Sequence, residues 1–281
     1  MFVFCLEKIG YPSNDRTGWD EFKEKVEKTS IAGMRYGQNL INKEFGYPEL
    51  PEIHFIFKSP YMNIYGYPEE LDYADIVPLP DNHIQVDAFC REIKETFELP
   101  EEFKTKIKPN DKLIYLSMGS IGSIDVDLMK KLVNELSKSS HKFIISMGPL
   151  NDQYELADNM WGQAFVPQTN VIPLVDLVIT HGGNNTVTET FSFGKPMIVM
   201  PLFGDQYDNA QRILEKGFGS RIDPYNFNDG ELNKMIDQIF ADEQIQKRCQ
   251  QAAERIAKAN SKEKACEKIE SIMAKLKLNV N

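Results

Sequence analysis

The sequence predicts an α/β protein built around a parallel, doubly wound β-sheet. Short apolar runs rich in β-branched residues alternate with segments of helical length from about residue 110 onward. One run, Leu177–Thr180, is followed at once by the pair Gly182–Gly183 and then by Asn185 and Thr186. Glycine permits a sharp turn, and asparagine and threonine suit the cap of a following helix. Sheets of this kind bind ligands at the carboxyl ends of their strands.

Six segments of this alternating region are predicted to be strands. A turn at Gly119–Ser120 and a helix with one apolar face from Val126 to Leu136 are expected between the first two. The tail from Asp229 to Leu276 is predicted to be helical and to pack back across the domains. The predicted strands are Leu113–Ser117, Phe143–Met147, Ala164–Val166, Leu177–Thr180, Met197–Met200 and Gly219–Ile222.

The first 109 residues show weaker patterns. A charged helix begins near Glu21, and its pairs Phe22/Val26 and Ile31/Met34 have the spacing of a buried face. The aromatic stretch that follows could line a pocket, although ordinary packing is the commoner use of such residues. The elements expected after the helix are a strand at His54–Phe57, a loop at Tyr61–Tyr67, a strand at Asn82–Val86 and a linker at Phe97–Asp111.

Composition excludes several classes of protein. The net charge is −10 and the isoelectric point near 5.1, which argues against nonspecific nucleic-acid binding. No apolar run reaches the roughly 18 residues of a membrane helix, and the start lacks a signal-peptide core. We therefore expect a cytoplasmic protein without a membrane span. No metal-ligand spacing occurs, and scattered, reduced thiols are expected at Cys5, Cys90, Cys249 and Cys266.

The stretch from Trp161 to Gln206 contains a series of spaced polar and glycine residues. Its single glycine pair does not match the GxGxxG fingerprint of dinucleotide-binding proteins. The whole series resembles the donor-binding signature of the UDP-glycosyltransferases, which move a sugar from a UDP-sugar to a small lipophilic acceptor. The matching residues are Phe165-Val166-Pro167-Gln168, His181-Gly182-Gly183, Asn185-Thr186, Glu189 and Asp205-Gln206.

This resemblance implies two Rossmann-like domains of the GT-B type, of which the N-terminal one is incomplete. Residues 1–109 would be a partial acceptor-side domain with a linker, and residues 110–281 the UDP-sugar donor domain with its C-terminal helices. Family members carry a catalytic histidine after an early strand and glycine. His54 and His83 each lie within a predicted strand instead. No catalytic base is assigned in this chain.

The resemblance places the donor diphosphate near His181, the Gly183 backbone, Asn185 and Thr186. A histidine at a helix start can donate to a phosphate oxygen, with help from the helix N-terminus. A structural histidine is the alternative. Ser120 resembles a residue of a second phosphate-facing turn, and an ordinary strand-to-helix turn explains it equally well.

The uridine and the sugar would contact the remaining residues of the signature. Phe165, where relatives often have tryptophan, would stack on uracil, and Gln168 would hydrogen-bond the base or ribose. Glu189 would accept the ribose hydroxyls, with an exposed helix glutamate as its alternative. Asp205 and Gln206 would bind sugar hydroxyls, or Asp205 could instead cap a helix.

Three functions remain open from the sequence. The first is metal-independent, inverting transfer of a hexosyl group from a UDP-sugar, which serves as co-substrate without any cofactor. The second is a non-catalytic UDP-sugar-binding module, or one subunit of a split glycosyltransferase. The third is a UDP-sugar epimerase of similar architecture, which the Asp205-Gln206 ending disfavours. A longer form of the chain that carries an upstream strand-Gly-His segment would favour the first function over the second.

Overall fold

The computed structural model describes residues 10–51, 54, 58–74, 76, 78–90 and 97–276. The predicted strand at His54–Phe57 and the thiol of Cys5 therefore lie largely outside the described residues. Contacts between residues divide the chain into two compact units, which are treated separately here. The first unit comprises Met1–Tyr65, Tyr73–Val86 and Asn260–Asn281, and the second comprises Gly66–Asp72 and Asp87–Ala259.

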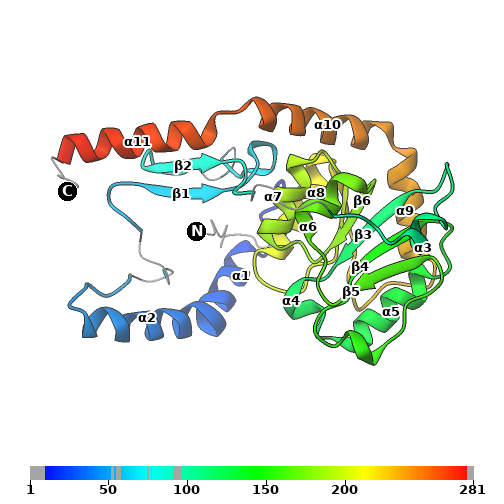
Figure 1. Ribbon diagram of the computed structural model, residues 1–281. Helices are drawn as coiled ribbons and strands as arrows, with labels where there is room; N and C mark the ends of the chain where they lie inside the picture. Colours follow the sequence, from blue (N-terminus) through cyan, green and yellow to red (C-terminus); the bar gives the residue numbers. More distant parts are fainter. Residues whose placement is uncertain are drawn as a thin grey trace. The chain divides into compact units, whose positions relative to one another are not determined.

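The second unit is built on a six-stranded parallel sheet (Figure 1). Its strand order is β5-β4-β3-β6-β7-β8, and side chains such as Ile114, Ile144 and Ile179 are fully buried within it. Apolar residues on both faces explain why this sheet forms the core. The strands are β3 (Leu113–Ser117), β4 (Lys142–Ser146), β5 (Met160–Gln163), β6 (Leu177–Thr180), β7 (Met197–Val199) and β8 (Gly219–Arg221).

Five of the six predicted strands are confirmed to within one residue, and the third is wrong. The sequence predicted Ala164–Val166, whereas β5 ends at Gln163. Met160 and Trp161 pair with β4, and Phe165 lies beyond the sheet with 78% of its surface exposed. The short apolar run Ala164–Val166 therefore marked the loop after the strand.

The chain reverses direction across the sheet between β3 and β6. From β3 it passes to β4 and β5 on one side, and then to β6, β7 and β8 on the other. Such a switch point opens a crevice at the carboxyl ends of the two central strands. Ser117 and Thr180, the last residues of β3 and β6, are direct register partners, so the loops that follow them start side by side.

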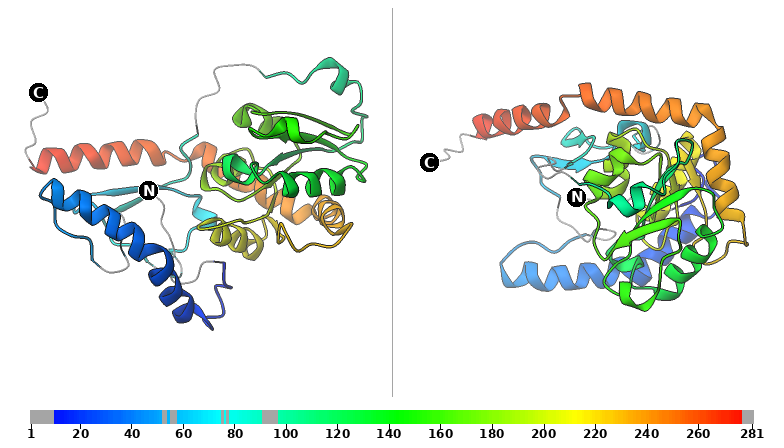
Figure 2. Two further views of the ribbon diagram at one scale, coloured as in Figure 1. Left: turned by 90° about the horizontal axis from the view of Figure 1, so that it is seen from below. Right: turned by 45° about the vertical axis from the view of Figure 1, so that its right-hand side comes forward.

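Helices of the second unit connect these strands and follow them. The predicted helix is α5 (Val126–Leu136), and Asp125 caps its N-terminus by accepting from the Leu128 amide. The tail after β8 runs from α9 into α10, drawn in orange in Figure 1 and Figure 2. The other helices are α3 (Glu101–Lys104), α4 (Gly119–Gly122), α6 (Gln168–Val171), α7 (Asn184–Ser192), α8 (Gln206–Lys216), α9 (Glu231–Ala241) and α10 (Glu243–Lys258), with short 3-10 turns at Asn151–Gln153 and Ile172–Leu174.

The predicted linker at Phe97–Asp111 is part of the second unit. Leu99 and Phe103 are buried in its core, and the ring of Phe97 lies 5.8 Å from that of Trp161. These three apolar residues anchor a stretch whose charge suggested a linker. The second unit accordingly includes residues before 110, and the division into an acceptor-side domain and a donor domain stays a prediction.

The first unit contains helices and a two-stranded sheet. A strand replaces the predicted aromatic loop at Tyr61–Tyr67, while the strand predicted at Asn82–Val86 is confirmed. Met34 is 47% exposed, so its predicted burial is wrong, whereas Ile31 is buried. The elements are α1 (Trp19–Val26), a π-helical turn (Glu27–Ile31), α2 (Ala32–Glu44), β1 (Asn63–Gly66), β2 (His83–Val86) and α11 (Ser261–Leu276), which packs against β2. The 3-10 turn at Glu69–Leu71, between β1 and β2 in sequence, belongs to the second unit.

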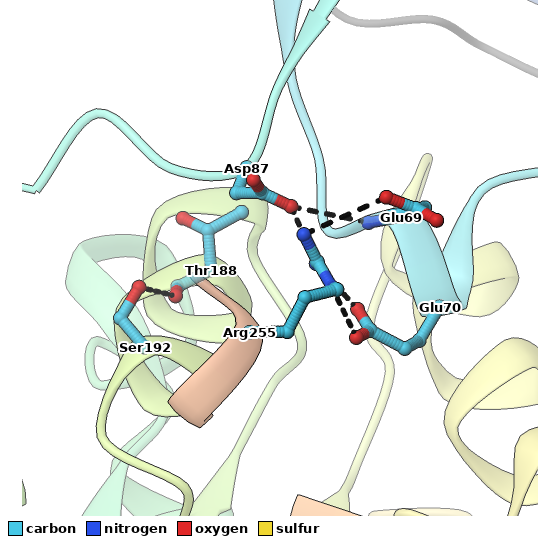
Figure 3. Close-up of polar contacts among 6 residues, drawn as sticks. All are labelled: Glu69, Glu70, Asp87, Thr188, Ser192 and Arg255. Atoms are coloured by element: carbon cyan, nitrogen blue, oxygen red, sulfur yellow. Dashed lines mark hydrogen bonds and ion pairs between the residues drawn. The ribbon is translucent and has the colours of Figure 1, made fainter. Parts of the chain in front are cut away.

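Residues 66–72 are held in the second unit by two arginines. The Arg212 side chain is almost fully buried and donates to the carbonyl oxygens of Leu71 and Asp72. Arg255 of α10 donates to both carboxylate oxygens of Glu70, at 2.6 and 2.7 Å, and to Asp87 at 2.6 Å (Figure 3). These acidic neighbours raise the pKa of Arg255, so its charge is permanent. The segment is therefore fixed to α8 and α10.

Candidate functional site

Two loops meet at the switch point of the sheet. After β3 the chain passes through Met118 into the short helix α4, and after β6 it passes through His181, Gly182 and Gly183 into α7. The sequence predicted a turn at Gly119–Ser120, and the structure forms α4 there, with Ser120 exposed. Both loops follow the carboxyl ends of parallel strands, where α/β proteins bind ligands.

The imidazole of His181 lies between two glycines. A Cβ atom built on Gly119 would lie 2.6 Å from Cε1 of the ring, and one on Gly183 would lie 2.5 Å from Nε2. Gly119 also has a φ of +68°, which disfavours a side chain. Both positions therefore require glycine because the histidine ring is packed against their backbones.

Burial makes His181 a weak base. Loss of solvent lowers its pKa below the ordinary 6.5, and a hydrogen bond to the Ser117 backbone offsets part of this shift. Its Nδ1 atom also lies 3.3 Å from the hydroxyl oxygen of Thr180. The ring is therefore neutral at pH 7, and an anion beside it would raise its affinity for a proton.

The glycine pair presents the start of α7. Gly182 has a φ of +85° and donates its amide to Oγ1 of Thr180 at 3.2 Å. Gly183 is the N-cap of α7, and no side chain caps the helix. Asn185 and Thr186, predicted as caps, lie inside the helix, because the helix begins at Asn184. The first amides of α7 are thus without a side-chain cap, as in helix N-termini that bind anions.

Three predicted residues, one from α6 and two from α7, come together beside this turn. Gln168 of α6 donates from Nε2 to Oε2 of Glu189 in α7 at 2.6 Å. Thr186 donates from its hydroxyl to Oε1 of Gln168 at 3.4 Å. This cluster offers a carboxylate, an amide and a hydroxyl, which are the groups that bind the hydroxyls of a ribose.

Phe165 and Asn185, like Ser120, are exposed members of the predicted set. Phe165 follows β5 and is 78% exposed, so its aromatic face is open to a planar ligand. Asn185 lies in the first turn of α7 and is also exposed. Neither side chain contributes to the core.

Asp205 and Gln206 occupy the loop after β7 and the start of α8. Oε1 of Gln206 accepts from the amides of Leu202 and Phe203, at 2.9 and 3.1 Å, and the side chain is 3% exposed. Asp205 stands at the N-cap position of α8 without a side-chain cap bond, and burial raises its pKa. Gln206 therefore shapes the loop, whereas the Asp205 carboxylate does not cap the helix.

Three further residues contact the site and were not predicted to do so. Asn209 of α8 donates from Nδ2 to the Gly182 carbonyl at 2.7 Å, and Tyr67 donates to Oδ1 of Asn209 at 2.8 Å. Asn184 donates to the carbonyl of Gly66 at 3.0 Å. Asn209 follows Asp205-Gln206 closely in sequence, and Tyr67 ends the aromatic stretch that could line a pocket, although the sequence did not relate it to Asn209.

The structure also bears on the expectations about metal sites, thiols and membrane spans. Within the described ranges, no cluster of three or more His, Cys, Asp or Glu side chains could hold a metal ion. Cys90, Cys249 and Cys266 are not in disulfide bonds, and burial raises the pKa of Cys249 to about 12. None of the helices that the structure describes is long and apolar enough to cross a membrane.

Known proteins match the part of the chain that contains this site. The family described as UDP-glucoronosyl and UDP-glucosyl transferase matches residues 71–258. The uncharacterized UDP-glucosyltransferase YdhE of Bacillus subtilis is 29% identical over 178 residues, which are 62% of this chain and 43% of YdhE. The NDP-glycosyltransferase YjiC of the same organism is 27% identical over 193 residues, which are 67% of this chain and 49% of YjiC. The chain thus spans about half the length of these relatives.

Solved structures show the same fold. The glycosyltransferase of kitacinnamycin superposes with a TM-score of 0.72 at 19% identity, covering 93% of this chain and 67% of that one. VinC in complex with dTDP gives a TM-score of 0.63 at 15% identity, covering 92% and 65%. The predicted GT-B architecture is confirmed. The first domain is incomplete relative to these structures, since about a third of their length has no counterpart here.

Proposed function

Because the chain belongs to the UDP-glucoronosyl and UDP-glucosyl transferase family, we propose that its second unit binds a UDP-sugar at the crevice between β3 and β6. The observation that carries this proposal is the Gln168–Glu189–Thr186 cluster beside the Gly182–Gly183 turn. A hydroxyl-binding cluster next to an uncapped helix start offers complementary groups for a ribose and a diphosphate.

The uridine occupies the side of the crevice near β5. The exposed face of Phe165 stacks on uracil, and Gln168 donates to or accepts from the base or ribose. Glu189 accepts hydrogen bonds from the ribose hydroxyls. Its carboxylate is already oriented by the amide of Gln168, so little ordering is needed on binding.

The diphosphate lies against the start of α7. The Gly183 amide, Asn185, Thr186 and the ring of His181 are its proposed partners, and Ser120 contributes from α4. The partial positive charge of a helix N-terminus stabilises the anion. Since His181 is packed between two glycine backbones, its distance from the bound phosphates is fixed by the fold.

The sugar extends toward the loop before α8. The carboxylate of Asp205 accepts from sugar hydroxyls, because no helix cap competes for it. Oε1 of Gln206 is committed to the Leu202 and Phe203 amides, which leaves its amide group as the proposed sugar contact. Gln206 therefore both shapes the loop and donates to the ligand.

The proposed reaction is hexosyl transfer with inversion at the anomeric carbon. The hydroxyl oxygen of a small lipophilic acceptor forms a bond to C1, the bond from C1 to the β-phosphate oxygen breaks, and UDP departs. The acceptor proton passes to a base that is not assigned here. The helix N-terminus and His181 offset the charge on UDP without a metal ion or cofactor.

A UDP-sugar-binding module that works with a second chain is the other candidate. The observation that favours it is that every residue of the proposed donor site lies in the second unit. In the part that the structure describes, the first unit has only a two-stranded sheet. On this proposal the chain binds the donor and another polypeptide supplies the catalytic base.

Calorimetric titration of UDP into the full chain and into Glu189→Gln tests donor binding. Saturable binding that the substitution weakens by about tenfold or more is expected. Glu254→Gln is a matched control, because Glu254 also accepts from a glutamine, Gln250, at 3.3 Å on an exposed helix. Absence of UDP binding by folded protein would contradict the proposal.

Release of UDP from UDP-glucose in the presence of a panel of small phenols and alcohols separates the two candidates. Acceptor-dependent release by the chain alone supports the complete enzyme. Tight UDP-glucose binding without release supports the donor-binding module.

A further inference from the structure

The backbone of Gly182 is bonded through both of its polar groups to side chains. Its amide donates to Oγ1 of Thr180, and its carbonyl oxygen accepts from Nδ2 of Asn209 at 2.7 Å. Asn209 comes from α8, and its side chain is 3% exposed. The Gly182–Gly183 peptide is therefore held from the α8 side.

Because this peptide is planar, fixing the Gly182 carbonyl also fixes the direction of the Gly183 amide. In a trans peptide, the carbonyl oxygen and the following amide hydrogen point to opposite sides of the bond. The described residues contain no cis peptide. When Asn209 fixes the Gly182 carbonyl toward α8, the amide of Gly183 must point away from α8. Gly183 is the N-cap of α7, so this amide is one of the donors at the helix start.

A second hydrogen bond fixes Asn209 itself. An asparagine amide could turn over and present oxygen instead of nitrogen to the Gly182 carbonyl. The Gly182 carbonyl can only accept, so it faces Nδ2, and the hydroxyl of Tyr67 holds the amide in this orientation by donating to Oδ1 at 2.8 Å. Burial raises the pKa of Tyr67 well above 10.0, so the hydroxyl keeps its proton.

We propose that Asn209 is a positioning residue, held by Tyr67, that aims the Gly183 amide at the donor diphosphate. The inference rests on the proposed donor site. It assigns to Asn209 of α8 a role in binding that involves no contact between its side chain and the ligand. Loss of the Asn209 hydrogen bond should weaken binding of the diphosphate part of UDP and leave binding of the uridine part unchanged, because Gln168, Glu189 and Phe165 have no hydrogen bond to Asn209.

The test compares uridine and UDP binding by NMR titration of the full chain. In Asn209→Asp the donor to Gly182 is lost, while Oδ1 can still accept from Tyr67. We expect the affinity for UDP to fall about tenfold and that for uridine to change less than about twofold. A purely structural role would lower both affinities together, so the diagnostic quantity is the ratio of the dissociation constant for uridine to that for UDP. Because Asn209→Asp also places a negative charge near the diphosphate, Tyr67→Phe, which adds no charge, must lower this ratio too.

Asn233→Asp is the matched control, since Nδ2 of Asn233 also donates to a backbone carbonyl, that of Glu135, at 2.7 Å. It should leave the ratio unchanged. Tyr67→Phe removes one hydroxyl and keeps the ring, so we expect it to lower the ratio of the uridine to the UDP dissociation constant as well. If Asn209→Asp does not fold, Tyr67→Phe tests the proposal alone. An unchanged ratio in a folded variant that still binds UDP overturns the inference alone. No UDP binding by the unaltered chain overturns the donor site as well.

Discussion

Nε2 of Gln168 lies 2.6 Å from Oε2 of Glu189, although 21 residues separate them in sequence. Gln168 opens α6, and Glu189 lies in the middle of α7. Between them the chain forms β6, the central strand next to β3. The strand order of the sheet thus brings the two halves of the proposed uridine site together before any ligand binds.

This pair predicts a specific loss on changing Glu189. In Glu189→Gln the charged acceptor for the ribose hydroxyls is replaced by a neutral amide. The unaltered chain should bind UDP about tenfold more tightly than 2′-deoxy-UDP, and the variant should bind the two equally. Calorimetric titration of both nucleotides measures this. A preference for UDP that survives the substitution would show that Glu189 does not contact the 2′-hydroxyl.

The exposed ring of Phe165 predicts an effect on binding without an effect on stability. Phe165→Ala should weaken UDP binding about tenfold through loss of stacking. Because 78% of the residue is exposed, the free energy of unfolding should change by less than about 0.5 kcal/mol. Phe165→Trp should bind UDP at least as tightly as the unaltered chain, and Phe165→Leu should behave like alanine. Equal binding by all four proteins would refute stacking.

The pKa of His181 predicts a proton taken up with UDP. Burial holds this pKa below 6.5 in the free protein, so the ring is neutral at pH 7. A diphosphate beside the ring raises the pKa, and binding therefore takes up protons and strengthens as the pH falls toward 6. Calorimetry in buffers of different ionisation enthalpy should give a larger proton uptake for the unaltered chain than for His181→Asn. The nucleotide's own titration is common to both proteins, and equal uptake would contradict the assignment.

Alanine substitutions at two glycines distinguish the effect of backbone strain from the effect of contact with His181. Gly119 and Gly230 both have positive φ, +68° and +80°, but only a side chain at 119 would meet the histidine ring. Alanine at either position should cost about 1 kcal/mol of unfolding free energy through strain. Only Gly119→Ala should also lose UDP affinity. Thermal unfolding and UDP titration of both variants measure the two effects, and equal affinity losses would contradict the proposed role of His181.

The arginine of Figure 3 predicts a loss of stability. Asp87 is 4% exposed in its side chain, and Arg255→Ala would remove the cationic donor that lies 2.6 Å from its carboxylate. The free energy of unfolding should fall by about 2 kcal/mol, less than for a fully buried pair because Arg255 is 30% exposed. Lys104→Ala, which removes an exposed pair with Glu101, should cost less than about 0.5 kcal/mol. Denaturant unfolding compares them, and equal effects would contradict the role of burial.

Much of the second unit could be predicted from the sequence because its signals are local. Leu113–Ser117 and Leu177–Thr180 are continuous apolar runs, and both coincide with the observed strands. The third strand was misplaced because β5, with the sequence Met-Trp-Gly-Gln, has a weaker apolar signal than the Ala164–Val166 loop after it. Hydrophobicity alone does not distinguish a strand from an apolar loop that leads to a site.

The polar contacts of the site depend on long-range packing and could not be predicted. Tyr67 reaches Asn209 across 142 residues of sequence, and no periodicity relates them. Gln206 was expected to bind sugar, but the loop geometry that turns its oxygen to the Leu202 amide is set by tertiary structure. Residue types and spacing indicated which side chains lie at the site, and only the fold showed which of them hold others in place.

Backbone amide NMR of the isotopically labelled chain during UDP titration tests the donor site most directly. We expect progressive, saturable shifts centred on Ser120, Gly183, Asn185 and Thr186, with smaller changes near Gln168. Helices α9 and α10 should be unaffected, since none of their residues belongs to the proposed site. Shifts confined to other elements, or no shifts at nucleotide concentrations well above the millimolar range, would contradict the proposal that the crevice between β3 and β6 binds UDP.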